Sequence, residues 1–230
     1  MKIRAVLQAT ILTVLYVAIS ELLGAWVLIP YWLDKPQFTE NYFALVSGIL
    51  LLPVIYYFTK KQTKPLLCLK FKDNLKWNSI GIVSGVLYPF VQYPLISIYN
   101  IISKGNHKIG YKFDGYLNFL TFNAVNFIST IMLIPIAEEL FFRGLIQGKL
   151  QEKLNPILSI IISSLLFGLM HLKLENLMLN EPMNFQLTYI TFFGGLILGT
   201  LFYKSKSLIP AILAHMFWNL TVHFCEKINF

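Results

Sequence analysis

Charged residues are scarce in this chain of 230 residues: Asp, Glu, Lys and Arg together make up 13%, whereas 56% of the residues are hydrophobic. Soluble domains carry about 25% charged and about 45–50% apolar residues, so the composition excludes an ordinary soluble enzyme. Segments that cross a lipid bilayer must satisfy their own backbone hydrogen bonds, which favours helices. We therefore predict an all-α, polytopic transmembrane helical bundle that forms a single integral membrane domain over residues 1–230.

Several common catalytic and structural patterns are also missing. The two cysteines, Cys68 and Cys225, lie far apart, which excludes a disulfide framework and a Cys-x-x-Cys metal site. The sequence contains no His-Glu-x-x-His, so the familiar zinc-protease helix is absent. No set of serine, aspartate and histidine suggests a nucleophile triad. A hydrolase of this sequence would therefore need another way to activate its nucleophile.

The formal net charge of +8 reflects membrane topology rather than nucleic-acid binding. Lysines are most concentrated between residues 60 and 76, and basic residues collect on cytoplasmic loops, where they face anionic lipid headgroups. We expect membrane lipid as a partner and no nucleic acid.

Hydropathy divides the chain into seven apolar segments, with an eighth if the longest one breaks near Pro135. The expected spans are residues 3–33, 42–58, 80–102, 118–151, 156–171, 187–203 and 209–223. Residues 173–186 form a loop that could cover a site. Glycines four residues apart suit close helix packing at three places, Gly81 and Gly85, Gly144 and Gly148, and Gly195 and Gly199.

Three ionisable residues, Glu138, Glu139 and Arg143, interrupt the longest apolar segment. An ionisable group at membrane depth costs roughly 2.5–3.5 kcal/mol, so a functional site is the default hypothesis. On a helix, Glu139 and Arg143 share a face and can pair, whereas Glu138 is rotated by about 100°. This arrangement suits Glu138 as a general base that is supported by Glu139 and Arg143.

Three further polar residues lie on later apolar segments: His171 ends one, and His215 and Asn219 share a face of the last. At about 1.5 Å per residue from the connecting turns, Glu138 and His171 come to similar depths. His215 is expected to be shallower, and Asn219 to match Glu138 better. Helix tilt, or a turn near residues 204–207 that is set deeper in the protein, would have to absorb this difference.

These residues suit amide hydrolysis without a covalent intermediate. Glu138 and His171 can polarise a water molecule and take its proton, while His215 and Asn219 can donate hydrogen bonds to the oxyanion. Alternatively, Glu138, His171 and His215 could ligate a divalent metal such as zinc. The residues alone leave metal dependence open.

The motifs Glu138-Glu139-x-x-x-Arg143, Phe167-x-x-x-His171 and His215-x-x-x-Asn219 occur in this order within residues 118–223. This set resembles the CPBP family of intramembrane proteases, also called Abi. The family comprises CAAX proteases and bacteriocin-processing enzymes, and includes the type II CAAX prenyl endopeptidases.

The resemblance implies an intramembrane endopeptidase in the bacterial cell membrane. Glu138 and His171 would activate water, His215 and Asn219 would stabilise the oxyanion, and Glu139 and Arg143 would occupy supporting positions. The family is often labelled metalloprotease, although a glutamate mechanism without metal is the favoured one. The implied substrate is a membrane-associated or lipidated peptide or protein, in CAAX-type processing, in maturation of bacteriocins or signal peptides, or in self-immunity.

Two alternatives need no proteolysis. The first is a non-catalytic membrane protein for immunity or scaffolding that binds a peptide or a partner. The second is a transporter that uses the intramembrane charges, which would be expected to show internal repeats with paired broken helices. We find no such repeats in the sequence, so the protease remains the leading hypothesis.

Overall fold

The structure, a computed structural model, describes residues 2–34, 49, 74–104, 127–172, 183 and 185–228. Every regular element in these residues is a helix, as predicted. The separate helices are α1 (Lys2–Asp34), α3 (Leu75–Lys104), α7 (Pro156–Met170), α9 (Gln186–Ser205) and α10 (Ile209–Ile228). Between α3 and α7, residues 129–151 form one continuous helix, which we call the motif helix.

The motif helix changes its winding along its length. Its four consecutive parts are η2 (Ser129–Leu133), α5 (Ile134–Glu139), η3 (Leu140–Gln147) and α6 (Gly148–Gln151), of which η2 and η3 are π-helical. The helix passes through Pro135 without ending, and this proline comes just after the π-helical part η2. The structure therefore shows no break at Pro135.

Three described helices contain stretches long and apolar enough to cross a membrane, namely Lys2–Ser20, Leu75–Ser103 and Gln186–Ser205, and α7 is a shorter apolar helix. The predicted span at residues 42–58, most of the basic segment at 60–76 and nearly all of the loop at 173–186 lie outside the described residues. The expected total of seven to eight spans therefore stays a prediction.

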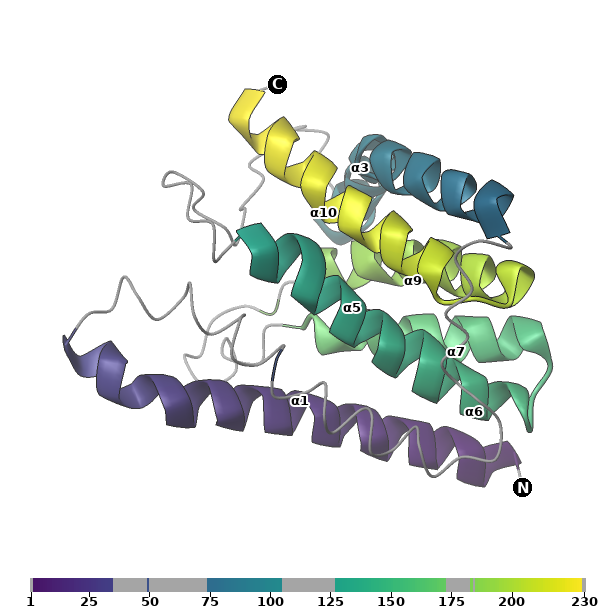
Figure 1. The fold of residues 1–230 in the computed structure, drawn as a ribbon, viewed down its shortest axis with the longest axis horizontal. Coiled ribbons are helices and arrows are strands. Elements are labelled where there is room, and N and C mark those ends of the chain that lie inside the picture. Colours follow the sequence, from purple (N-terminus) through teal and green to yellow (C-terminus); the bar gives the residue numbers. More distant parts are fainter. Residues whose placement is uncertain are drawn as a thin grey trace.

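The motif helix is at the centre of the bundle. In Figure 1 it runs between α1 on one side and α10 on the other, and α3 lies beyond α10. The η3 part also contacts α7 and α9. Side chains from all these directions can therefore reach the glutamates of the motif helix.

The turn between the motif helix and α7 has the sequence signature of a helix start. The Asn155 side chain accepts a hydrogen bond from the Leu158 N–H at 2.9 Å, and Pro156 occupies the first helical position. This confirms the predicted boundary.

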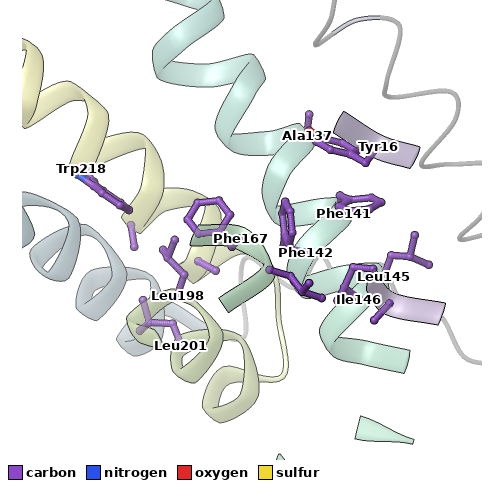
Figure 2. Packing of buried hydrophobic residues seen from close by; sticks show 14 of the residues in the cluster. Tyr16, Ala137, Phe141, Phe142, Leu145, Ile146, Phe167, Leu198, Leu201 and Trp218 are labelled. Atoms are coloured by element: carbon purple, nitrogen blue, oxygen red, sulfur yellow. The ribbon is translucent and has the colours of Figure 1, made fainter. Parts of the chain in front are cut away.

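The motif helix and α7 run antiparallel through an aromatic core. Phe142 meets Phe167 edge-on at 5.2 Å, and the Ser163 hydroxyl donates to the Phe142 carbonyl at 3.0 Å. Both phenylalanines are fully buried, and Figure 2 shows them side by side. Glu138 precedes Phe142 by four residues, and His171 follows Phe167 by four residues. Because the helices are antiparallel, these steps lead in the same direction, which confirms the similar depths expected for Glu138 and His171.

The turn between α9 and α10 is partly buried, although Lys206 within it is exposed. Lys206 adopts the left-handed conformation, with φ 53°, and ends α9. The next two residues, Ser207 and Leu208, have no exposed surface. The Ser205 hydroxyl accepts from the Ser207 N–H and donates to the Ser207 carbonyl, so the backbone of this turn is satisfied locally.

Glycines at two of the three predicted pairs allow close approach between helices. A methyl group on Gly81 would strike the Pro210 backbone of α10, and one on Gly85 would strike the Ala214 carbonyl. Gly195 and Gly199 of α9 similarly face Ser164 and Gln147. These contacts bring α3 against α10, and α9 against α7 and the motif helix.

Replacing Gly85 with alanine is expected to destabilise the protein despite the better helix propensity of alanine. The gain in propensity is at most about 1 kcal/mol, whereas overpacking against a rigid backbone costs about 1–3 kcal/mol or more. Thermal unfolding in detergent would show a lower midpoint for Gly85→Ala. The control is Val83→Ala on the same helix, where Val83 is exposed. An unchanged or higher midpoint for Gly85→Ala would contradict the packing described here.

Candidate active site

The acidic motif forms a buried ion pair with the arginine one turn later. The Arg143 Nε atom lies 3.1 Å from the Glu139 Oε2 atom, and neither side chain has any exposed surface. The Nε–H bond does not point along this line, so the contact is an ion pair rather than an aligned hydrogen bond. The predicted pairing of Glu139 with Arg143 is present, although residues 140–147 are wound as a π-helix.

Two further contacts hold the Arg143 guanidinium. One of its Nη atoms donates to the Gly195 carbonyl of α9 at 3.3 Å, and its Cζ atom lies 4.5 Å from the centre of the Phe167 ring. A cation over an aromatic face is favourable, and more so where water is excluded. Arg143 therefore links the motif helix to α7 and α9 while it neutralises Glu139.

His215 of α10 lies against both glutamates. Its Nδ1 atom is 3.0 Å from Glu139 Oε1, which is a hydrogen-bond distance, and its Nε2 atom is 3.8 Å from Glu138 Oε2, which is too long for one. Because a carboxylate can only accept, we assign the Nδ1 proton to the bond with Glu139. This leaves the Nε2 edge of the ring facing Glu138.

Aromatic rings hold the imidazole of His215 from two sides. Phe167 meets it edge-on at 5.8 Å, and Trp218 lies at 5.4 Å in a tilted arrangement. Such packing restricts the ring to one orientation and keeps the pair with Glu139 away from water.

Two expectations about depth and direction differ from the structure. His215, rather than Asn219, comes to the level of Glu138, because the turn before α10 is partly buried. Asn219, one turn further along, instead donates to the Thr130 carbonyl of the motif helix at 2.9 Å. In addition, the two carboxylates do not point apart as expected, since both approach the same imidazole.

His171 ends α7 and is half-buried. Its Nδ1 atom lies 2.8 Å from the Phe167 carbonyl, so this nitrogen carries the proton and Nε2 is left with its lone pair. The Phe167 ring contacts His171 at 4.8 Å as well as His215. Phe167 thus brings the two predicted histidines to neighbouring positions.

Glu138 is buried with one carboxylate oxygen that has no hydrogen bond. Its exposed fraction is 8%, and its Oε2 atom has no hydrogen-bond partner within the part of the chain that the structure describes. A buried carboxylate without a hydrogen bond is costly, so its retention needs a functional explanation. The sequence-based choice of Glu138 as the reactive carboxylate fits this geometry.

The conditional metal set of Glu138, His171 and His215 does not assemble as a coordination site in the structure. Among the described residues, no group of three or more His, Cys, Asp or Glu side chains is placed to hold a metal ion. We therefore derive no chemical step through a metal.

Sequence reasoning missed Gln147, which extends the buried polar stripe of Glu139 and Arg143 by one more turn. Its Nε2 atom donates to the Gly199 carbonyl at 2.9 Å, and the residue has no exposed surface. The sequence contained a signal for it, because Glu139, Arg143 and Gln147 are spaced by four residues. Gly195 and Gly199 on α9 have the same spacing. Gln147 and Arg143 make parallel contacts with these two glycines.

Comparison with known proteins agrees with this geometry. The family model described as "Type II CAAX prenyl endopeptidase Rce1-like" matches residues 120–221. This match covers less than half of the chain, and we call the matched residues the Rce1-like domain. This domain includes the motif helix, α7, α9 and most of α10, together with all six predicted site residues, and it confirms the resemblance to the type II CAAX prenyl endopeptidases.

A bacterial relative extends the similarity beyond the Rce1-like domain. The chain is 23% identical over 183 residues to the "Putative membrane peptidase YdiL" of Bacillus subtilis (strain 168), covering 80% of this chain and 70% of that protein. No solved structure matches the chain. Together, the Rce1-like domain, the name of this relative and the apolar helices support a membrane protease.

Proposed function

We propose that this chain is an intramembrane endopeptidase that hydrolyses a peptide bond with water activated by Glu138. The observation that carries the proposal is a buried carboxylate without a hydrogen bond on Oε2, placed beside an imidazole that a second carboxylate and an arginine hold. Structural ion pairs alone would leave no reason to keep Glu138 Oε2 without a hydrogen bond inside apolar helices.

In the proposed reaction, Glu138 and the Nε2 atom of His171 polarise one water molecule. The water oxygen bonds to the carbonyl carbon of the substrate, and its proton passes to Glu138. Glu138 then returns this proton to the leaving nitrogen as the C–N bond breaks, which yields a carboxylic acid and an amine. General acid–base catalysis of this kind contributes typically about 10²–10⁴-fold.

His215 is proposed to stabilise the negative oxygen of the intermediate. Its Nδ1–H bond to Glu139 fixes the ring, and the Nε2–H of a doubly protonated ring can donate to that oxygen. The amide of Asn219 has a second proton beyond the one given to Thr130, so it can act beside His215. Arg143 supports the pair through its ion pair with Glu139.

The proposed substrate is a membrane-associated or lipidated peptide. The residues of the site are buried, while many apolar residues of the surrounding helices are exposed, for example Val83 and Phe90 of α3 and Leu165 and Leu169 of α7. In a bilayer these residues face lipid, which favours a substrate that is itself held in the membrane. CAAX-type processing, bacteriocin or signal-peptide maturation and self-immunity are the proposed biological settings, in a bacterial cell membrane.

His171→Ala is expected to lower cleavage by about 10²-fold or more, since it removes one of the two groups that polarise water. Purified protein in liposomes would be given a panel of lipidated and unlipidated peptides, and products would be identified by mass spectrometry. The control is Leu169→Ala, which alters an exposed residue near the same end of α7. Wild-type rates for the His171 variant would remove this residue from the mechanism.

The same assay with a chelator tests metal dependence. Cleavage that persists in chelator agrees with the mechanism written here. Loss of cleavage that added zinc restores would require a metal at the site. A folded wild-type protein that cleaves none of the panel, together with a cellular phenotype unchanged by Glu138→Ala and His171→Ala, would instead favour a non-catalytic immunity or scaffold protein.

A further inference from the structure

Among the described residues, the imidazole of His215 has a hydrogen bond at one of its two nitrogens. Its Nδ1 atom lies 3.0 Å from Glu139 Oε1, whereas Nε2 is 3.8 Å from Glu138 Oε2, which is beyond hydrogen-bond distance. The outer torsion of a histidine side chain is broad, so a single hydrogen bond leaves the ring room to tilt. The direction of Nε2 therefore depends on the two aromatic rings that pack against the imidazole, Phe167 and Trp218.

Trp218 follows His215 by three residues on α10, a spacing that makes side chains neighbours on a helix. The centres of the two rings are 5.4 Å apart with 32° between their planes, and the exposed fraction of Trp218 is 7%. The indole is thus a large, buried surface beside the imidazole. It can keep that ring in one orientation only if it is itself held in place.

Tyr88 of α3 holds the indole from a neighbouring helix. Its ring meets Trp218 edge-on, with 4.6 Å between ring centres and 80° between planes. Its hydroxyl donates to the Ile190 carbonyl of α9 at 2.6 Å, and its exposed fraction is 3%. Helix α3 lies against α10 (Figure 1). Because the Tyr88 side chain is attached to α3 at one end and bonded to α9 at the other, it leaves the indole little room to turn away.

Helix α9 limits the position of the indole from a further side. A methyl group on Gly194 would strike the outer edge of the Trp218 indole, and it would also crowd the Tyr88 ring. These three residues line one pocket together with small residues of α3 and α10, among them Gly85 and Ala214. The backbone of α9 therefore fixes the indole together with Tyr88.

We propose that Tyr88 and Trp218 are positioning residues that hold the His215 imidazole. The Tyr88 ring, anchored on α9, fixes the Trp218 indole. The indole in turn keeps the Nε2 atom of His215 directed at Glu138. The inference rests on the proposed endopeptidase function, and it gives α3, which precedes the Rce1-like domain, a part in the reaction. Neither aromatic residue touches the substrate or transfers a proton.

The first test compares Trp218→Leu with Trp218→Phe in the liposome cleavage assay. Leucine removes the flat ring beside His215, and a misplaced catalytic group can cost about 100-fold, so kcat should fall by on the order of 100-fold while KM stays within about twofold. Phenylalanine restores a flat ring and should recover at least about tenfold of that loss. The control is Trp77→Leu, because Trp77 is half-buried against the same core about three helical turns before Tyr88.

The second test reaches the indole from α3 and from α9. Tyr88→Phe keeps the ring but removes its bond to the Ile190 carbonyl, and Gly194→Ala pushes on the edge of the indole. Each should lower kcat by about tenfold at nearly unchanged KM, because the imidazole is shifted rather than lost. The added methyl group meets side chains rather than backbone, so the helices should stay packed. The control is Tyr99→Phe on α3, where the ring contacts Tyr189 instead.

The outcomes separate this inference from the proposed function. Trp218→Leu activity within about threefold of wild type, while Glu138→Gln is inactive, would overturn the positioning role and leave the protease intact. A higher KM with unchanged kcat would also overturn it, since Trp218 would then act in substrate binding. A fall in kcat that Trp77→Leu matches, or that follows the loss of thermal stability, would reduce the two residues to packing. Cleavage that Glu138→Gln retains in full would instead remove the proposed function, and the positioning role with it.

Discussion

Replacing Arg143 with methionine is expected to destabilise the folded protein by about 3–5 kcal/mol, the usual result of removing one partner of a buried ion pair. Methionine fills most of the volume of the arginine stem, so the loss comes mainly from charge. Glu139 would keep its contact with His215 but lose the guanidinium, and the link to the Gly195 carbonyl would disappear. The stability of the site thus depends on Arg143 more than on any other charged group.

A double-mutant cycle can attribute this loss to the ion pair. Unfolding in detergent would be compared for Arg143→Met, Glu139→Gln and the combined variant. Because glutamine removes the uncompensated charge, the combined variant should be less destabilised than the sum of the single changes by about 1 kcal/mol or more. Lys153→Met, at an exposed position shortly after the motif helix, is the control. Additive losses, or an Arg143→Met midpoint equal to that of the control, would contradict the pairing.

Local sequence signals predicted two features of the structure. One is the helix that follows residue 155, and the other is the acidic cluster. Asn155 and Pro156 mark a helix start by capping and by the geometry of proline, both of which act within one turn. The spacing of Glu139 and Arg143 predicted their contact for the same reason. These features depend on neighbouring residues, so a single sequence contains enough information to find them.

The depth of His215 and the role of α3 depend on tertiary packing, which local patterns do not encode. A rise of about 1.5 Å per residue gives the height above a turn but not the depth of the turn itself, and Ser207 and Leu208 proved to be buried. The sequence also did not predict the π-helical winding on either side of α5. Residues 129–147 contain no sequence signal for it other than polar residues at a functional site.

Glu138→Gln is expected to lower cleavage by about 10³-fold or more while the protein stays folded. Glutamine keeps the size of the side chain but cannot accept the proton of water, and loss of a general base costs typically about 10²–10⁴-fold. Folding should be spared, because Glu138 lacks a hydrogen bond on Oε2 and its carboxylate is 3.8 Å from the nearest nitrogen of His215. Removing a buried charge of this kind is more apt to raise the stability than to lower it.

The central measurement is therefore the rate of peptide cleavage in liposomes by wild type, Glu138→Gln and Glu152→Gln. Glu152 follows the end of the same helix and is exposed, so its variant controls for the loss of one carboxylate. The account predicts cleavage by wild type and Glu152→Gln at similar rates and almost none by Glu138→Gln, with all three proteins folded. Equal cleavage by all three would contradict the assignment of Glu138 as the group that activates water.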